Sequence, residues 1–249
     1  MNYEVIRMES YRLIPEKYRF ISNSGLKCIA LVTMLTDHYA SAFLQNDQTV
    51  FLSLFGHKLT VYTLLRIIGR LAFPIYAFLI VEGLRYTRNR KAYAIRLLVF
   101  AIISEIPWNL LHTGSFLYQR QNVFFTLLLG YLGLWVIDSI KNGEKRLKKI
   151  GILFALFLIS VILRADYGCT GFGFILLLGL LDNHPVYRAV VGSCFLSSTW
   201  QAGLAFIPIA FYNGQRGFIR NKFLKLLFYV IYPLHMIILF LIKKSAGGY

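Results

Sequence analysis

GLKCIALVTMLTDHYASAFL, residues 25–44, is a mostly apolar run that carries an aspartate and a histidine side by side, Asp37 and His38. A helix needs about 20 predominantly apolar residues to cross the hydrocarbon core of a bilayer. Ionisable side chains at membrane depth cost free energy, and they therefore usually mark functional sites. The stretch predicts a membrane-spanning helix that holds an acid and an imidazole inside a helical bundle.

The whole chain is too apolar for an ordinary soluble domain. Hydrophobic residues make up 57% of the 249, and the mean hydropathy is +0.58. These values predict an all-α, polytopic integral membrane bundle of about 8–10 transmembrane helices. Glycines and prolines interrupt the chain between residues 169 and 213, which predicts short or broken helices there. The apolar runs, which we interpret as nine crossings, are residues 22–44, 62–84, 91–112, 122–140, 147–165, 169–182, 186–199, 201–213 and 223–243.

Positive charge is concentrated in three short hydrophilic connections. The chain has 27 Lys and Arg against 11 Asp and Glu, a formal net charge of +16. Such basicity also occurs in nucleic-acid-binding proteins, but its position between apolar runs indicates cytoplasmic loops that face membrane lipids. We expect no nucleic-acid partner and a cytoplasmic N-terminus. Residues 1–21 are predicted to be a cytoplasmic amphipathic segment, and residues 22–249 a single transmembrane domain.

The cysteines do not suggest a metal centre. Cys28, Cys169 and Cys194 lie far apart, with no CxxC pair and no cysteine–histidine spacing typical of a zinc site or a disulfide framework. We therefore expect no metal.

Four polar residues on four predicted helices fall at a similar depth. Counting ~1.5 Å per residue from each helix end places His38, Arg70, Glu105 and His235 slightly outward of the midplane. This agreement favours one shared site. The alternative is a set of separate structural pairs, such as Arg70 with Glu105.

Asp37 and His38 suit general-base chemistry. A neutral imidazole can take a proton from a hydroxyl or amine while that group attacks a carbonyl, and a neighbouring group can hold the ring's tautomer. Adjacent residues on a helix point about 100° apart. The partner of His38 can therefore be Asp37, Glu105 or His235, while Arg70 or Asn109 is a candidate for stabilising the oxyanion.

Cations near the inner ends of the helices suit an anionic ligand. Lys27 lies eleven residues before His38, so the two project from one helix face about 16 Å apart. The segment EGLRYTRNR, residues 82–90, brings Arg85 and Arg88 together beside Glu82, and guanidinium groups bind phosphates well. The alternative is that these cations, with Arg96, contact lipid headgroups.

A second polar group lies near the opposite ends of the helices. Glu105 and Asn109 are one helical turn apart on either side of Pro107. Asn122, Asp166 and Tyr167 occur at the outer ends of neighbouring predicted helices, where they are candidates for the rim of a substrate entrance. Ordinary loop polarity explains them equally well.

The combination of these blocks resembles the TraX family, named for a conjugation-associated membrane protein that N-acetylates pilin. The family in turn is similar to the acyltransferase-3-like transmembrane acyltransferases, in which a basic residue precedes a proposed catalytic histidine by eleven positions. Lys27 and His38 match that spacing, although lysine replaces the usual arginine, and Arg85 and Arg88 are similar to an arginine pair linked there to acyl-CoA. The matching blocks are GLKCIALVTMLTDHYA (25–40), IGRLAFPIYAFLIVEGLRYTRNRKAYAIRLL (68–98), SEIPWNL (104–110), NVFFTLLLG (122–130), ADYGCTG (165–171), NGQRG (213–217) and LFYVIYPLHMIILFLI (227–242).

The resemblance implies an acetyl-CoA-dependent acetyltransferase of the inner (cytoplasmic) membrane. The implied acceptor is the N-terminus of a pilin-like protein, or in many relatives a hydroxyl of a surface glycan. Two other classes stay open from the residues: a proton-coupled secondary transporter, which midplane carboxylates and broken helices also suit, and a non-catalytic scaffold of a conjugation or secretion machine.

Overall fold

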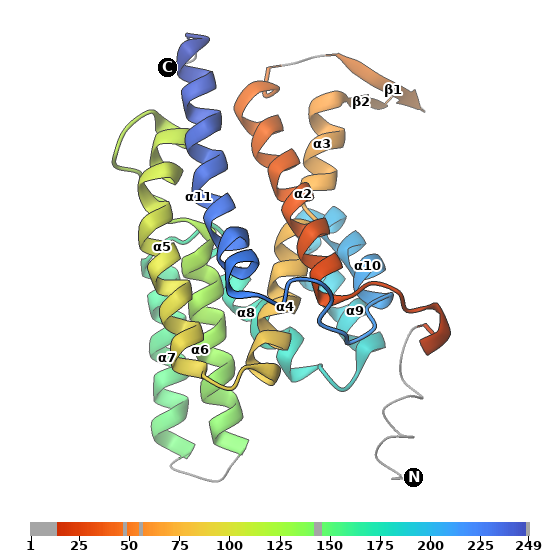
Figure 1. Ribbon diagram of the computed structural model, residues 1–249, viewed down its shortest axis with the longest axis vertical. Helices are drawn as coiled ribbons and strands as arrows, with labels where there is room; N and C mark the ends of the chain where they lie inside the picture. The colour runs from red at the N-terminus through yellow and green to blue at the C-terminus, as the bar shows by residue number, and fades with distance from the viewer. Residues whose placement is uncertain (1–13, 47–48, 55–56, 142–145, 248–249) are drawn as a thin grey trace.

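The computed structural model describes residues 14–46, 49–54, 57–141 and 146–247, which form a helical bundle (Figure 1). In the described part of the chain, strands are confined to one antiparallel hairpin, β1 (Val50–Leu54) and β2 (His57–Thr60). The predicted all-α class is confirmed. The helices are η1 (Glu16–Tyr18), α2 (Asn23–Phe43), α3 (Val61–Gly69), α4 (Ala72–Tyr86), α5 (Arg90–Thr113), α6 (Val123–Lys141), α7 (Arg146–Ile162), α8 (Gly168–Leu180), α9 (Pro185–Phe195), η2 (Ser197–Ala205), α10 (Phe206–Ala210) and α11 (Lys222–Ser245).

Each predicted apolar run coincides with helix, but the second run is divided. It forms α3 and α4, which meet at Arg70 and Leu71. The N–H of Leu71 donates to the carbonyl of Ile68, three residues back, so the chain tightens locally instead of continuing a regular α-helix. The prediction of short segments between 169 and 213 is confirmed: α8 has 13 residues, α9 has 11 and α10 has five.

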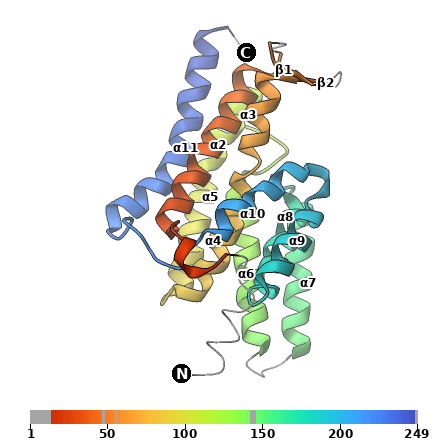
Figure 2. The ribbon, with the colours of Figure 1, turned by 90° about the vertical axis from the view of Figure 1, so that its right-hand side faces the viewer.

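Helix α4 is the centre of the bundle. Eleven of its 15 residues are buried, and it packs against α2, α6, α8 and η2. Helix α6 packs against α5, α7 and α8, while α11 crosses the bundle against α5 and α2. In both ribbon views α2 and α11 begin partway up the bundle, above the lower ends of α6 and α7 (Figures 1 and 2).

The outer surface is that of a membrane protein. Large apolar side chains are exposed along α5, α7 and α11, including Ile102, Phe154 and Leu241, and apolar surface on this scale belongs in lipid. Four helical units are long and apolar enough to cross a bilayer: Val61–Tyr86, Arg90–Thr113, Val123–Ile140 and Lys222–Ser245. The exact number of crossings stays a prediction.

Two isolated bridges connect loops that are distant in sequence. Gln121 pairs with Ala165, which brings the start of α6 beside the connection between α7 and α8. Ile21 pairs with Tyr212, so the segment before α2 lies against the segment that leads to α11. These bridges position polar residues at two levels of the bundle.

Candidate active site

His38 on α2 and His235 on α11 are joined by a short hydrogen bond. Nδ1 of His38 lies 2.6 Å from Nε2 of His235, and the ring planes are 6° apart with centroids separated by 4.9 Å. The centroid separation exceeds the N–N distance by about two ring radii, so the bond lies in the plane of both rings. The structure thus brings two of the predicted site residues into direct contact.

The bonding of His235 assigns the tautomers of both rings. Nδ1 of His235 lies 2.8 Å from the carbonyl oxygen of Ile231. A carbonyl only accepts, so this nitrogen carries a proton, and Nε2 of His235 accepts from Nδ1–H of His38. Neutral His38 then presents its lone pair at Nε2, which none of the described residues hydrogen-bonds. A base oriented by a second group is the arrangement expected for general-base catalysis.

Aromatic side chains surround the histidine pair. Trp108 and Tyr232 present their rings edgewise to His38, with centroids 6.4 Å and 6.2 Å away. Trp108 is fixed by a 2.9 Å hydrogen bond from Nε1 to the carbonyl of Arg120, and His112 packs on its other side with centroids 3.8 Å apart. The walls around His38 are therefore rigid and mostly apolar.

Asp37 does not contact the ring of His38 but pairs with an arginine that the sequence analysis did not single out. Nη1 of Arg66 on α3 donates to Oδ2 of Asp37 at 2.6 Å. Gly69 makes this possible, because a Cβ at that position would collide with the Asp37 side chain. Of the three partners considered for His38, His235 is the one in contact.

Arg70 lies with Asp166 and Tyr167. Its charge acts on Asp166, Tyr167 and Asp37. Tyr167 also stacks on Phe73, with ring centroids 3.6 Å apart. In this loop, burial raises the pKa of Asp166 to about 6, against the opposing effect of Arg70. The structure therefore joins a predicted catalytic residue to two residues predicted to rim the substrate entrance.

Glu105 is bound to Asn122 rather than to Arg70. Oε2 of Glu105 accepts from Nδ2 of Asn122 at 2.6 Å, and the same amide also donates to the carbonyl of Ala101. Asn109 donates from Nδ2 to the carbonyl of Phe116 at 2.8 Å. The Glu105 bond ties α5 to the start of α6, and the Asn109 bond ties the end of α5 to the loop that follows it. The predicted roles of these residues in substrate binding stay predictions.

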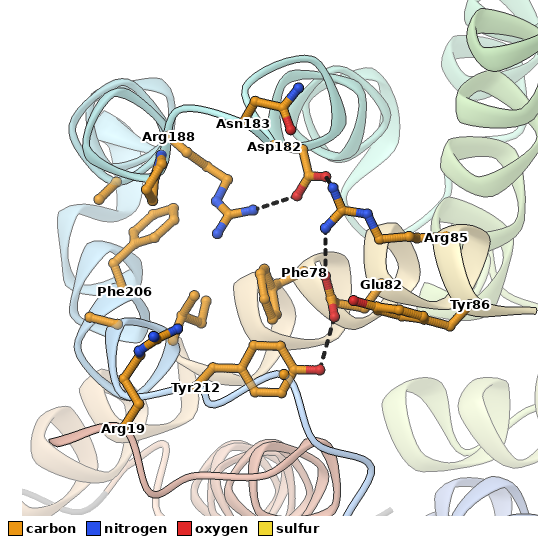
Figure 3. A pocket seen from close by; sticks show the side chains of 15 residues that line it. Arg19, Phe78, Glu82, Arg85, Tyr86, Asp182, Asn183, Arg188, Phe206 and Tyr212 are labelled. Carbon is orange, nitrogen blue, oxygen red and sulfur yellow. Dashed lines mark hydrogen bonds and ion pairs between the residues drawn. The ribbon is translucent and has the colours of Figure 1, made fainter. Parts of the chain in front are cut away.

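Glu82 and Arg85 belong to an ion-pair network beside a cavity of about 130 Å³ (Figure 3). Arg85 lies 2.5 Å from Asp182 and 3.9 Å from Glu82, while Arg188 lies 3.0 Å from the other oxygen of Asp182. Tyr212 donates its hydroxyl to Glu82 at 2.8 Å. Burial raises the pKa of this phenol, so it keeps its proton.

The other predicted anion-binding residues lie outside that network. Arg88 is exposed just beyond the end of α4. Arg96 is exposed on α5 and lies over the ring of Tyr93, 5.4 Å from its centroid. Lys27 is half-buried near the start of α2. Their predicted role toward a coenzyme stays a prediction.

Several residues in these groups went unrecognised in the sequence. Arg66 was the clearest signal, because it is a cation inside an apolar run, one turn before Arg70. Tyr232 lies three residues before His235, and thus on the same face of the helix, which was a weaker signal. No spacing links Asp182 and Arg188 to Arg85, because the pairing depends on how the turn between α8 and α9 packs against α4.

The model of the TraX protein family matches residues 22–243. The chain belongs to the TraX family. Over 245 residues it is also 29% identical to "Probable fimbrial assembly protein FimC, serogroup H1" of Dichelobacter nodosus, which covers 86% of this chain and 92% of that relative. No solved structure matches this TraX-family chain. The match extends over both the histidine pair and the Glu82 network, so both lie within the family domain.

Proposed function

We propose that this TraX-family protein is a multi-pass acetyltransferase of the inner membrane, with its N-terminus in the cytoplasm. It takes acetyl-CoA from the cytoplasmic side as acyl donor and transfers the acetyl group to an amine or hydroxyl. The observation that carries the proposal is the chain from Ile231 through His235 to His38, because it leaves Nε2 of His38 as an oriented basic nitrogen inside a membrane bundle.

The chemistry of His38 follows from its bonding. Its Nε2 removes the proton from the acceptor N–H or O–H while that nitrogen or oxygen forms a bond to the acetyl carbon. The imidazolium keeps its Nδ1–H bond to His235, which stabilises the new charge. The C–S bond then breaks, and the proton on Nε2 passes to the departing thiolate, so the products are the acetylated acceptor and the free thiol of CoA.

The other polar residues have supporting roles in this proposal. Arg70, whose charge acts on Tyr167, and Asn109 are the candidates for stabilising the oxyanion of the tetrahedral intermediate. Asp37 is already neutralised by Arg66 and thus fixes the position of α2 against α3. Trp108 and Tyr232 exclude water from the reacting nitrogen, which strengthens electrostatic interactions there.

The acceptor is proposed from the relative. Because the similar Dichelobacter nodosus protein is named for fimbrial assembly, we propose the N-terminus of a pilin-like subunit as the first acceptor to test. A hydroxyl of a surface glycan is the second acceptor to test, because a histidine base can remove a proton from either an amine or a hydroxyl.

The test is acetyl-CoA binding and slow hydrolysis by the purified full chain, with His38→Ala and Arg85→Ala/Arg88→Ala beside the wild type. We expect the wild type to bind and hydrolyse acetyl-CoA, and His38→Ala to bind it without turnover. Absence of affinity in folded wild type overturns the donor assignment, and flux of a solute into proteoliposomes without CoA consumption then supports a transporter. Binding without any effect of His38→Ala on turnover overturns the general base.

A further inference from the structure

Four cations on α2, α5, α11 and the loop before α11 are linked by electrostatic interactions. This basic cluster consists of Lys27 on α2, Arg96 on α5, Arg216 in the loop before α11, and Lys225 on α11. Arg216 and Lys225 act electrostatically on Lys27, and Arg216 and Arg96 act on Lys225. No salt bridge involves any of the four within the described ranges.

The lack of a carboxylate distinguishes the basic cluster from the arginines of the bundle that form ion pairs. Holding four like charges together is unfavourable unless an anion balances them. Elsewhere the described residues provide that balance from within the chain: Arg66 pairs with Asp37, Arg85 and Arg188 pair with Asp182, and Arg90 pairs with Asp138.

The fold holds the loop cation of the basic cluster in place. The carbonyl of Arg216 accepts hydrogen bonds from both the N–H and the hydroxyl of Ser24, at 3.2 Å and 2.8 Å. The same hydroxyl accepts from the N–H of Ile219 at 2.8 Å. Gly217 has a φ of +75°, and a Cβ there would collide with Ser24. The loop is therefore clamped to the start of α2.

Arg96 is also oriented by its neighbours. Its guanidinium lies over the ring of Tyr93, 5.4 Å from the centroid, and its charge acts on the hydroxyl of Tyr229. Arginine that lies over an aromatic ring keeps its donors available at the edge of the guanidinium. The basic cluster thus combines the oriented guanidinium of Arg96 and the fixed backbone of Arg216 with the two lysines.

Two cations of the basic cluster lie on helices that begin away from the lower ends of α6 and α7. Cations that serve headgroups lie at the outer ends of membrane helices. Arg146 and Lys148 occupy such positions at the start of α7. The starts of α2 and α11, the helices that carry Lys27 and Lys225, lie above the lower ends of α6 and α7 in both views (Figures 1 and 2).

Aromatic rings connect the basic cluster to the histidine pair. Tyr229 stacks on Phe100 with centroids 4.9 Å apart, and Phe124 lies 6.1 Å from Tyr229 and 4.9 Å from Tyr232. Tyr232 in turn borders His38 at 6.2 Å. Along α2, Lys27 and His38 share one face about 16 Å apart.

We propose that the basic cluster binds the phosphate groups of the acyl donor, so that the donor's thioester end extends along this aromatic path to His38. The inference rests on the proposed acyltransferase function and specifies its donor site. It assigns the phosphates to Lys27, Arg96, Arg216 and Lys225, whereas Arg85 already has Asp182 as its counter-ion. The same chemistry would also hold a lipid phosphate, so the experiment separates the two sources.

The experiment measures binding of acetyl-CoA, and of the adenosine bisphosphate half of CoA, to full-length protein in neutral phosphatidylcholine vesicles. The test variant is Arg96→Gln/Lys225→Gln. The matched control is Arg146→Gln/Lys148→Gln, which removes the same charge at an exposed helix end. Losing two charged hydrogen-bond donors predicts about 100-fold weaker binding of both probes, while the control stays within about threefold of wild type. Arg96→Lys/Lys225→Arg, which keeps the charges, retains most of the affinity and shows that the site still folds.

Three results overturn the inference, and each identifies a different error. Unchanged coenzyme binding in Arg96→Gln/Lys225→Gln, together with loss in Arg85→Ala/Arg88→Ala, moves the phosphates to the Glu82 network and leaves the proposed function intact. If Arg96→Gln/Lys225→Gln binds acetyl-CoA as wild type does, but phosphatidylglycerol in the vesicles no longer raises its melting temperature, the basic cluster is a lipid site. Absence of acetyl-CoA binding in folded wild type removes the donor itself, and with it the proposed function.

Discussion

Replacing His235 tests the central contact of the proposed site. His235→Leu removes the acceptor for Nδ1–H of His38 but keeps an apolar side chain of similar size on α11. The bond is short, at 2.6 Å, and His235 is buried, so no water readily replaces it. Once His38 has taken a proton, the bond involves a charged donor, and such bonds contribute roughly 1.5–3 kcal/mol. Because each 1.4 kcal/mol is tenfold in rate, we expect kcat to fall about 10- to 150-fold.

The assay is release of free CoA thiol in vesicles, with acetyl-CoA binding measured separately. His235→Leu should bind the donor as wild type does, since His235 lies at the far end of the aromatic path from the basic cluster. His235→Gln is the matched variant, because its carbonyl oxygen can still accept from His38, and it should recover part of the lost rate. Wild-type kcat in His235→Leu would refute the reasoning, because the orientation of His38 would then not depend on this bond.

Three further predictions concern stability. Gly69→Ala forces a methyl group against Asp37 and should destabilise the fold by about 1–3 kcal/mol. Gly151→Ala in α7, where the added methyl meets open space, should not lower the melting temperature, because alanine is the better helix former. Asp166 has its pKa raised to about 6 from 3.8 by burial, so its contribution to stability is complete below pH 4 and is lost as pH rises through 6. In wild type this loss should amount to about 2–3 kcal/mol of unfolding free energy, and Asp166→Asn should not show it when thermal unfolding is measured across this pH range. If Asp166→Asn has the same pH profile as wild type, the raised pKa of Asp166 is not the cause. Ser24→Ala leaves the buried N–H of Ile219 without its acceptor and removes one of the two donors to the carbonyl of Arg216, so it should cost about 1–3 kcal/mol, measured as a lower melting temperature.

The sequence alone predicted the membrane helices and the polar residues inside them, because both follow from composition and spacing. Apolar runs of spanning length predict membrane helices because the bilayer fixes the length and excludes unpaired backbone. The same rule made Asp37, His38 and His235 conspicuous, since each is an ionisable group inside such a run. Glycines and prolines between 169 and 213 correctly predicted short helices, because both residues interrupt regular α-helix. Lys27 and His38 share a face for the simple reason that eleven residues are close to three turns.

The partners of these residues depended on tertiary packing. Depth along a helix predicts that His38 and His235 lie at one level, but not that their rings meet, because rotation about each helix axis is set by contacts with neighbouring helices. Packing also joined Asp37 to Arg66 and Glu105 to Asn122, where one-dimensional spacing left several partners open. Arg85 illustrates the limit most clearly. Its neighbour Arg88 and its position at a helix end suggest a phosphate site, yet the turn after α8, which packs against α4, places Asp182 against it. Whether a cation is available to a ligand depends on the charge that the fold brings opposite it, and that charge is distant in the chain.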